Sequence, residues 1–295
     1  VGLSHDGSTL YVYSNENQAS GDVYQSRFTG RSFQKGELVK GKVNTKDDEA
    51  GATLSPDGMT LYFSSARKGG KGGRDLYMAR KLPDGSFANP VSLGEPVNSE
   101  YDEDYPFMLA DGKTLYFSSK GHESMGGFDI FKTLYDENSN TWSRPENIGY
   151  PVNDAGDNMS LSLIANGRIG YAEYLREGGH GDLDIYSITF NNVTGHEPVM
   201  VYRGIINNPF ENKPLLASVT LKTKGEKGKI MGTYTPDPVS GAFVMIISPG
   251  NYTFTIEAPG FLTYMEDITV PQLKQDKEIV KRIIISFDQG AEITE

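Results

Sequence analysis

The chain has 295 residues, no cysteine, 17 Tyr, 14 Phe, 34 Gly, 15 Pro and a net charge of −11. The lack of cysteine excludes disulfide bonds, thiolate catalysis and cysteine-ligated metals. Residues 1–198 hold 18 Lys and Arg against 28 Asp and Glu, which argues against nucleic acid or anionic lipid as a partner. No apolar run reaches the ~18 residues of a membrane span. Abundant aromatic residues, glycine and proline predict an all-β chain.

A turn followed by an apolar strand occurs four times in the first 198 residues. The turn contains Asp-Gly or Asn-Gly, marked by Asp6, Asp57, Asp111 and Asn166, at spacings of 51, 54 and 55 residues. Two more markers keep this register: an Asp-x-aromatic element at Asp22, Asp75, Asp129 and Asp184, and a Val-Asn pair at residues 43–44, 97–98 and 152–153. Three markers in one register predict a structural repeat.

Each copy divides into four short strands. In the second copy these are residues 51–55, 61–65, 75–79 and a weaker strand at 91–93. Asp-Gly between two apolar runs is a strong hairpin signal. Four antiparallel strands repeated at this period predict a propeller blade.

The repeat resembles a known family. Residues 55–65 read Ser-Pro-Asp-Gly-Met-Thr-Leu-Tyr-Phe-Ser-Ser, Gly-Gly precedes Asp129-Ile-Phe, and residues 142–149 read Trp-Ser-Arg-Pro-Glu-Asn-Ile-Gly. These elements resemble the TolB-like, WD-type propeller repeats of envelope proteins, over residues 1–192. The last copy departs from the pattern, with Asn166 for Asp and Gly170 for Leu. The resemblance implies four recognisable blades of a larger ring.

The pattern changes after residues 191–198, and strands of another spacing follow. Residues 199–202, 217–221, 242–247 and 252–257 read as strands, which predicts a β-sandwich. Gly204 with residues 214–219, 241–243, 249–252 and 260–261 resembles the carboxypeptidase-regulatory-like, transthyretin-like domain, over residues 199–272. The resemblance implies an inward-packed Tyr252 and no catalytic residues. We therefore expect propeller blades over 1–197, a sandwich over 198–287 and a tail or linker over 288–295.

A propeller followed by this sandwich resembles the middle of OmpA-family envelope proteins, including type IX secretion accessory factors. The resemblance implies a non-catalytic scaffold in the periplasm, associated with the outer membrane. Its partners would be other envelope proteins, some with basic segments, and peptidoglycan would be reached only through a domain outside this sequence. The alternative is a secreted propeller protein that binds or hydrolyses glycans.

Candidate site residues lie eight to ten positions before the turns. Aligned on the turn, Asp48, Asp102 and Asp157 coincide, and Glu49, Glu103 and Asn158 follow them. In a blade this segment enters the innermost strand, so the carboxylates would gather at one mouth of the channel. The glycine-rich loops 68–73 and 121–127 would lie on the same face as mobile connections. An acidic mouth would attract a basic segment or a cation; alternatively, each Asp caps its neighbour's backbone and fastens the blades together.

Other candidate sites have weaker support. Residues 136–140 carry oxygens like a calcium loop but lack its Gly and distal Glu, which favours a hairpin turn. His122 and His180 are interpreted as solvent-exposed loop residues. No nucleophile-elbow or zinc-protease motif occurs, and acids at equivalent repeat positions differ from a glycosidase pair, which needs distinct environments. We expect no enzyme activity, metal or cofactor.

Overall fold

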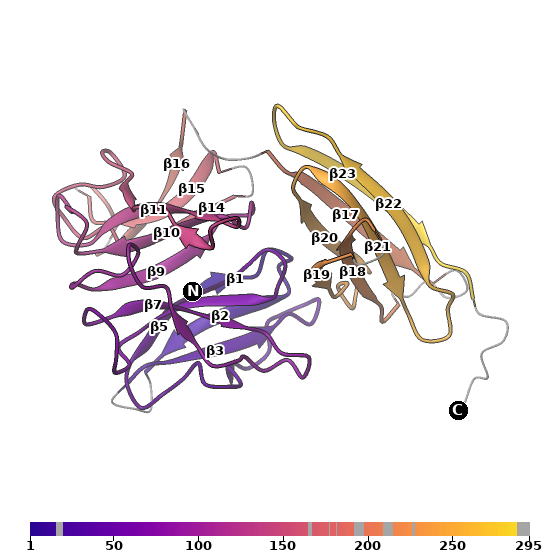
Figure 1. The fold of residues 1–295 in the computed structure, drawn as a ribbon, viewed down its shortest axis with the longest axis horizontal. Coiled ribbons are helices and arrows are strands. Elements are labelled where there is room, and N and C mark those ends of the chain that lie inside the picture. The colour runs from indigo at the N-terminus through magenta and orange to yellow at the C-terminus, as the bar shows by residue number, and fades with distance from the viewer. Residues whose placement is uncertain are drawn as a thin grey trace.

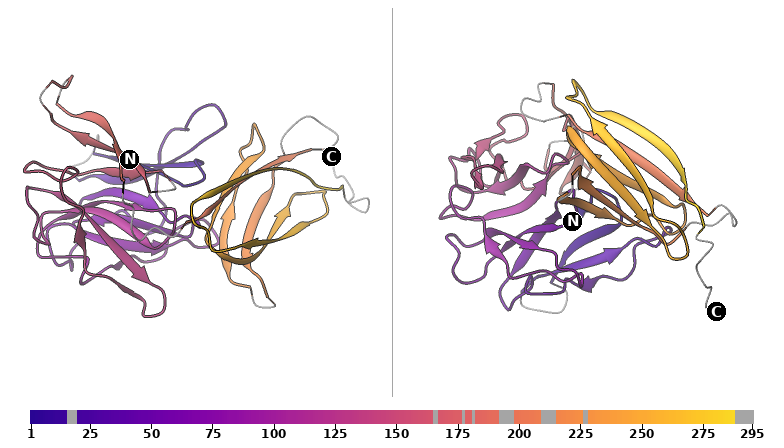
Figure 2. Two further views of the ribbon diagram at one scale, coloured as in Figure 1. Left: turned by 90° about the horizontal axis from the view of Figure 1, so that it is seen from above. Right: turned by 45° about the vertical axis from the view of Figure 1, so that its right-hand side comes forward.

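The structure, a computed structural model, describes residues 1–15, 20–164, 167–176, 178–180, 182–191, 198–208, 215–225 and 228–287. Every regular element in these residues is a β-strand, which confirms the expected all-β class. None of the described segments forms a helix that could span a membrane. The strands form two bodies that lie side by side, a repeat part from β1 to β16 and a C-terminal unit from β17 to β23 (Figures 1 and 2).

The repeat part consists of four antiparallel sheets in chain order, here called repeat sheets 1 to 4. Sheet 1 contains β1 (Gly2–Leu3), β2 (Thr9–Ser14), β3 (Asp22–Arg27) and β4 (Glu37–Leu38). Sheet 2 contains β5 (Glu49–Leu54), β6 (Thr60–Ser65), β7 (Asp75–Arg80) and β8 (Val91–Ser92). Sheet 3 contains β9 (Glu103–Met108), β10 (Thr114–Ser119), β11 (Asp129–Asp136), β12 (Thr141–Trp142) and β13 (Glu146–Asn147), and sheet 4 contains β14 (Leu161–Leu163), β15 (Ile169–Tyr174) and β16 (Asp184–Thr189).

The strands predicted for the second repeat are confirmed as β5 to β8. The sequence Thr-Leu-Tyr-Phe-Ser-Ser occurs in both β6 and β10, and all six residues are buried in each. These central strands are buried because sheets 2 and 3 have a sheet on either side. Their apolar side chains belong to clusters that join neighbours: Phe63 packs with Tyr11 between sheets 1 and 2, and Leu76 with Phe117 between sheets 2 and 3.

The Asp-Gly turns end the strands on one edge of the repeat part, which we call the turn edge. Gly58 has a φ of 70°, a left-handed conformation that glycine adopts without steric cost. Asp57 accepts a hydrogen bond at 2.9 Å from the N–H of Met59, and its carboxylate also accepts one from the Ser55 hydroxyl. Asp6 and Asp111 make the same backbone bond, at 3.0 and 2.9 Å. Asn166, the fourth turn marker, lies outside the described residues.

The C-terminal unit has two sheets that share one hydrophobic cluster. One sheet contains β20 (Ala242–Ile247), β17 (Met200–Asn207) and β23 (Lys277–Ile284); the other contains β19 (Ile230–Tyr234), β18 (Ser218–Thr223), β21 (Gly250–Glu257) and β22 (Tyr264–Val270). Tyr252 packs into the cluster, as the resemblance implied. β23 was not predicted from the sequence, and it pairs in parallel with β17 across the whole length of both strands. The tail predicted over 288–295 lies outside the described residues.

The four repeat sheets do not close into a ring within the described part of the chain, because no sheet joins sheet 4 to sheet 1. The far face of sheet 4 is open: Tyr171 is 50% exposed and Ile185 81% exposed. Both lie on the side opposite Ala172 and Tyr174, which pack toward sheet 3. The predicted acidic segments therefore follow one edge of an open row of sheets rather than surrounding a closed channel.

Candidate functional site

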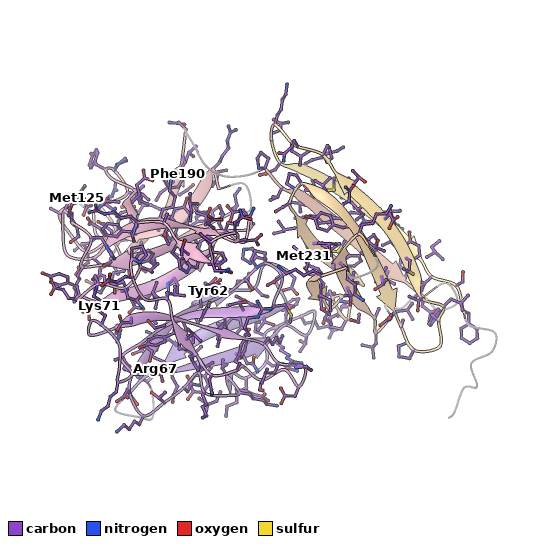
Figure 3. All side chains as sticks on the ribbon, viewed as in Figure 1. Tyr62, Arg67, Lys71, Met125, Phe190 and Met231 are labelled. Atoms are coloured by element: carbon purple, nitrogen blue, oxygen red, sulfur yellow. The ribbon has the colours of Figure 1, made fainter. Side chains whose placement is uncertain are left out.

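All five candidate carboxylates lie on one edge of the repeat part, opposite the turn edge, which we call the carboxylate edge. Glu49 pairs with Ser65 at this end of sheet 2, while Leu54 pairs with Leu61 at the other end, beside the turn. Figure 3 places Arg67 and Lys71, from the loop after β6, and Met125, from the loop after β10, far from Met231 of the C-terminal unit. The carboxylate edge is thus separate from the C-terminal unit.

Each candidate aspartate holds a peptide group of the preceding sheet. Asp102 Oδ1 accepts a hydrogen bond at 3.1 Å from the N–H of Arg74, and the N–H of Glu103 donates at 2.9 Å to the carbonyl of Arg74. We call this two-point contact the peptide clamp. The same clamp joins Asp48 and Glu49 to Gly21 at 2.7 and 2.9 Å, and Asp157 and Asn158 to Phe128 at 2.8 and 2.6 Å.

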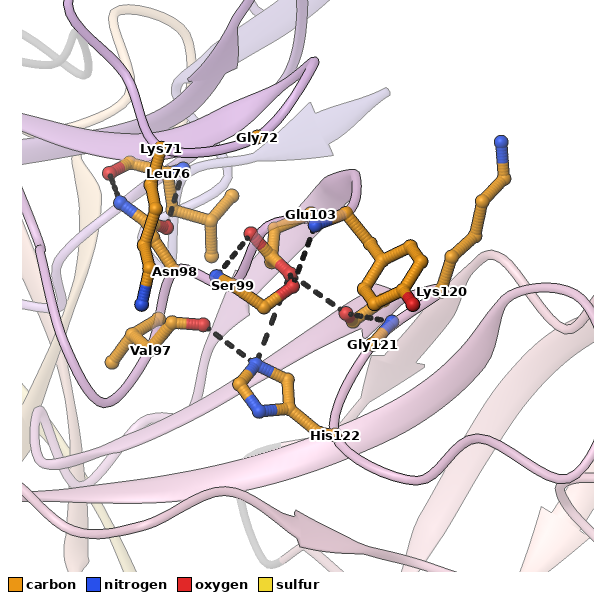
Figure 4. A network of polar contacts seen from close by, with 12 residues as sticks. Lys71, Gly72, Leu76, Val97, Asn98, Ser99, Glu103, Lys120, Gly121 and His122 are labelled. Atoms are coloured by element: carbon orange, nitrogen blue, oxygen red, sulfur yellow. Dashed lines mark hydrogen bonds and ion pairs between the residues drawn. The ribbon is translucent and has the colours of Figure 1, made fainter.

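The asparagine of the Val-Asn marker makes a second two-point contact two residues further along the same strand. Asn98 Oδ1 accepts from the N–H of Leu76 at 2.8 Å, and Asn98 Nδ2 donates to the Leu76 carbonyl at 3.0 Å (Figure 4). The Asn98 side-chain amide thus makes the two hydrogen bonds that a neighbouring strand would make to the buried backbone of Leu76. Asn44 binds Val23 in this way at 2.8 and 2.9 Å, and Asn153 binds Ile130 with both bonds at 2.8 Å.

The two candidate glutamates are buried and fully engaged. Glu103 has no exposed side-chain surface and accepts hydrogen bonds from the Ser99 N–H at 2.9 Å, the Ser99 hydroxyl at 2.5 Å and the Ser119 hydroxyl at 2.8 Å (Figure 4). Burial raises the pKa of Glu103, and the bonds from Ser99 and Ser119 oppose that shift. Glu49, equally buried, accepts from Thr45 and Ser65.

Beside each buried glutamate, a basic side chain or a histidine lies against two aromatic rings, a position that we call the aromatic niche. The Arg67 guanidinium lies 5.0 Å from the Phe63 ring centroid and 4.9 Å from that of Tyr77. It also donates to the Val43 carbonyl at 2.5 Å and lies 3.3 Å from Glu49 Oε1. Cation–π contact and a buried ion pair thus act on one side chain.

His122 fills the corresponding niche in the third repeat. Its ring lies 6.0 Å from Phe117 and 5.5 Å from Phe131. Nε2 donates to the Val97 carbonyl at 2.8 Å and lies 3.8 Å from Glu103 (Figure 4). Burial lowers the pKa of His122. The interpretation of His122 as a solvent-exposed loop residue is therefore wrong, because its ring packs between two buried aromatic rings; His180 is exposed as expected.

Basic side chains neutralise part of the carboxylate edge. Arg74 forms ion pairs with Asp48 and, at 2.7 Å, with Asp104, so one guanidinium links sheets 2 and 3. Lys120 lies 2.9 Å from Asp102. Asp157 is exposed and forms no ion pair with any residue of the described chain. The edge is therefore less acidic than the sequence predicted, and the fastening alternative matches the hydrogen bonds.

The glycine-rich loop 68–73 makes hydrogen bonds and packs closely against the next repeat, and its mobility stays a prediction. Asp75 Oδ2 accepts hydrogen bonds from Lys71 N–H at 2.8 Å and Gly72 N–H at 3.2 Å. A Cβ on Gly72 would lie 1.7 Å from the Tyr101 carbonyl oxygen. Glycine is required there because the loop touches the next repeat's backbone.

Residues 136–140 form the hairpin turn between β11 and β12, as interpreted. Asp136 accepts hydrogen bonds at 2.9 Å from the Asn138 N–H and the Ser139 hydroxyl. Its oxygens therefore shape the turn.

The shared niche of these side chains was not predicted from the sequence, although a signal existed. Arg67, His122 and Arg176 each come two or three residues after the second strand of a repeat. Arg176 lies 4.4 Å from the Tyr174 ring and 5.3 Å from that of Tyr186. The carboxylate and amide oxygens of the carboxylate edge thus accept hydrogen bonds from N–H groups, hydroxyls and cations of the chain itself.

Comparisons with known proteins give remote likenesses only. No protein-family model matches the chain, and no curated protein matches it. Among solved structures, a putative TolB from Agrobacterium tumefaciens is 15% identical with a TM-score of 0.40, covering 94% of this chain and 83% of its own. A puromycin-hydrolysing peptidase of Mycobacterium tuberculosis is 12% identical with a TM-score of 0.35, covering 90% and 44%, and the GH43B protein of a Bacteroides ovatus xyloglucan locus is 11% identical with a TM-score of 0.36, covering 89% and 75%. Identities and TM-scores this low leave the function to be argued from the chain's own residues.

Proposed function

We propose that this chain is a non-catalytic binding scaffold of the bacterial cell envelope. In this proposal the repeat sheets are successive blades of a larger β-propeller, and the C-terminal unit is a carboxypeptidase-regulatory-like β-sandwich. The open face of sheet 4, with exposed Tyr171 and Ile185, supports a further blade packing there. The two C-terminal sheets around one cluster support the sandwich.

The observation that carries the non-catalytic proposal is the use of the acids as fasteners. Glu49 and Glu103 occupy equivalent positions in successive repeats, and each accepts hydrogen bonds from hydroxyl and backbone donors. A glycosidase pair needs one raised and one ordinary pKa in different surroundings, with room for a sugar between the carboxyl groups. Buried carboxylates at equivalent repeat positions, with oxygens that already accept internal hydrogen bonds, favour a structural role.

The carboxylate edge is the surface we propose for partner binding. Tyr101 and Met125 are each 53% exposed, and they adjoin the loops that carry Asp102 and Asp129. Tyrosine and methionine are enriched in protein interfaces. Asp157 is the candidate carboxylate most open to a basic partner, since Asp48 and Asp102 are paired with Arg74 and Lys120.

The location of the proposed scaffold is the periplasm, in association with the outer membrane and with type IX secretion or peptidoglycan. This part rests on the order of the two resemblances and on no contact in the structure. Fractionation of the full-length protein tests it, and recovery in the cytoplasm would contradict it.

Site-specific photo-crosslinking in the native host tests the binding surface. A crosslinker at position 101 or 125 should give one discrete adduct, whereas one at the exposed Leu82 on the turn edge should give none. The Asp48→Asn, Asp102→Asn, Asp157→Asn triple variant keeps each clamp oxygen and should lower the adduct yield.

A thermal-shift screen with glycans tests the alternative, a propeller protein that binds or hydrolyses glycans. Saturable stabilisation by one glycan would replace the scaffold proposal.

A further inference from the structure

A cavity of about 240 Å³ lies where the turn edge of sheets 1 and 2 meets the C-terminal unit. Residues 4–9 and 54–58 supply the wall on the repeat side, and residues 233–238 supply it on the other. Tyr234 is buried at this contact, and the charges of Asp57 and Asp6 contribute, after burial itself, to raising its pKa. The cavity is therefore built by both bodies.

Two basic side chains line this cavity without a direct partner. Arg27 ends β3, and Lys81 directly follows β7. Neither side chain makes a hydrogen bond or an ion pair within the described chain. Burial and the neighbouring Arg27 charge lower the pKa of Lys81, and Asp6 offsets this only in part. Two like charges thus share one wall, in which Lys81 is half-buried and Arg27 is exposed.

The acids of the same wall are already used. Asp6 accepts hydrogen bonds from the Ser4 hydroxyl at 2.6 Å and from the Ser8 N–H at 3.0 Å. Asp237 accepts from the N–H groups of Ser240 and Val239 at 2.6 and 3.1 Å. Their oxygens shape the two turns, and within the described chain neither aspartate forms an ion pair with Arg27 or Lys81.

The repeat does not require these cations. Position 134 of sheet 3, which corresponds to Arg27, is Leu, and position 135, which corresponds to Lys81, is Tyr. Moreover, Arg27 and Lys81 occupy non-equivalent repeat positions, and both line the cavity between sheets 1 and 2 and the C-terminal unit. Fastening of the sheets therefore does not explain them.

We propose that this cavity binds a small ligand through an oxyanion, carboxylate or phosphate, that lies between Arg27 and Lys81. Guanidinium and ammonium groups bind such oxyanions through charge-assisted hydrogen bonds. Both cations belong to the repeat part, so the anion is held from that side of the cavity.

Titration of the 295-residue chain with inorganic phosphate and with citrate, followed by calorimetry and melting temperature, tests this site. Ionic strength is held constant with sodium chloride, so that screening alone changes nothing. We expect saturable binding of at least one probe, and the tighter probe distinguishes a phosphate from a carboxylate ligand. No saturable binding of either probe in the millimolar range would overturn the proposal.

Three variants make the test specific. Arg27→Gln and Lys81→Gln should each weaken the probe about tenfold, the loss of roughly one charge-assisted contact. Arg80→Gln is the matched control, an exposed arginine at the repeat position equivalent to Arg27 that does not line the cavity. Without ligand, Lys81→Gln should leave the melting temperature unchanged or higher, because it removes a like-charge contact. A lower melting temperature for Lys81→Gln, or an equal loss of binding in Arg80→Gln, would contradict the site.

Discussion

The contact between sheets 2 and 3 and the contact between sheets 3 and 4 use the same backbone bonds but different charges. At the first, Asp102 and Glu103 clamp Arg74, whose side chain bridges Asp48 and Asp104. At the second, Asp157 and Asn158 clamp Phe128, and an uncharged amide stands where Glu103 does. The peptide clamp is therefore the shared structural element, and the ion pairs are additions to it.

The aromatic niche shows the same contrast. Arg67 is largely buried between two rings and compensates the buried Glu49. Arg176 also covers two rings, but it is exposed, and its closest hydrogen bond is to the Pro151 carbonyl at 3.4 Å. The same geometry thus has different energetic weight, because one cation faces a buried charge and the other faces water.

Removing these two arginines should give the largest difference. Arg67→Ala leaves Glu49 buried without its cation, and we expect a loss of about 3 kcal/mol in the free energy of unfolding. Arg176→Ala should cost under about 1 kcal/mol, as exposed cation–π contacts do. Urea unfolding measures both, and equal costs would show that the buried glutamate does not need its arginine.

Removing the marker asparagines should affect both contacts alike. Asn98→Ala and Asn153→Ala each leave a buried N–H unpaired and remove one of the two donors to a buried carbonyl, so each should lose about 2 kcal/mol. Asn191→Ala, at an exposed position, is the control and should lie within about 0.5 kcal/mol of the wild type. If Asn153→Ala costs far less than Asn98→Ala, the contact between sheets 3 and 4 depends on something other than these bonds.

Substitution of Asp102 separates its clamp bond from its charge. Asp102→Ala removes the acceptor for the Arg74 N–H and should cost about 1 kcal/mol. Asp102→Asn keeps an oxygen there and loses only the part-exposed pair with Lys120, for less than about 0.5 kcal/mol. The two variants would unfold at the same urea concentration if the charge alone mattered.

The smallest expected effect is the pH dependence that His122 of the third repeat adds to the stability. Burial lowers the pKa of His122, so the unfolded chain binds a proton more readily below its ordinary pKa near 6.5. Stability should therefore fall as the pH drops from about 7 through that value. His122→Gln should flatten this slope, leaving the part due to His5, whose pKa burial also lowers. A slope unchanged by His122→Gln would assign the whole dependence to other groups.

Much of the fold could be predicted from the sequence because its markers are local. The Asp-Gly turns specify hairpins, and the strands at residues 61–65 and 75–79 lie inside β6 and β7. The parallel strand β23 was missed because its pairing with β17 joins segments far apart in the chain. The alignment of Asp48, Asp102 and Asp157 found the right edge, but not the partners of these residues. The Arg74 N–H donates to Asp102 in one clamp, and the Arg74 guanidinium forms ion pairs with Asp48 and Asp104. No sequence spacing reveals that arrangement.

Hydrogen exchange at the Arg74 amide tests the central claim, that Asp102 fastens sheet 3 to sheet 2 through a backbone bond. The amide should be protected in the wild type and in Asp102→Asn, because both keep an acceptor oxygen at the clamp. In Asp102→Ala it should exchange much faster, while the Leu76 amide, held by Asn98, stays protected. An Arg74 amide that is unprotected in the wild type, or equally protected in Asp102→Ala, would contradict the clamp.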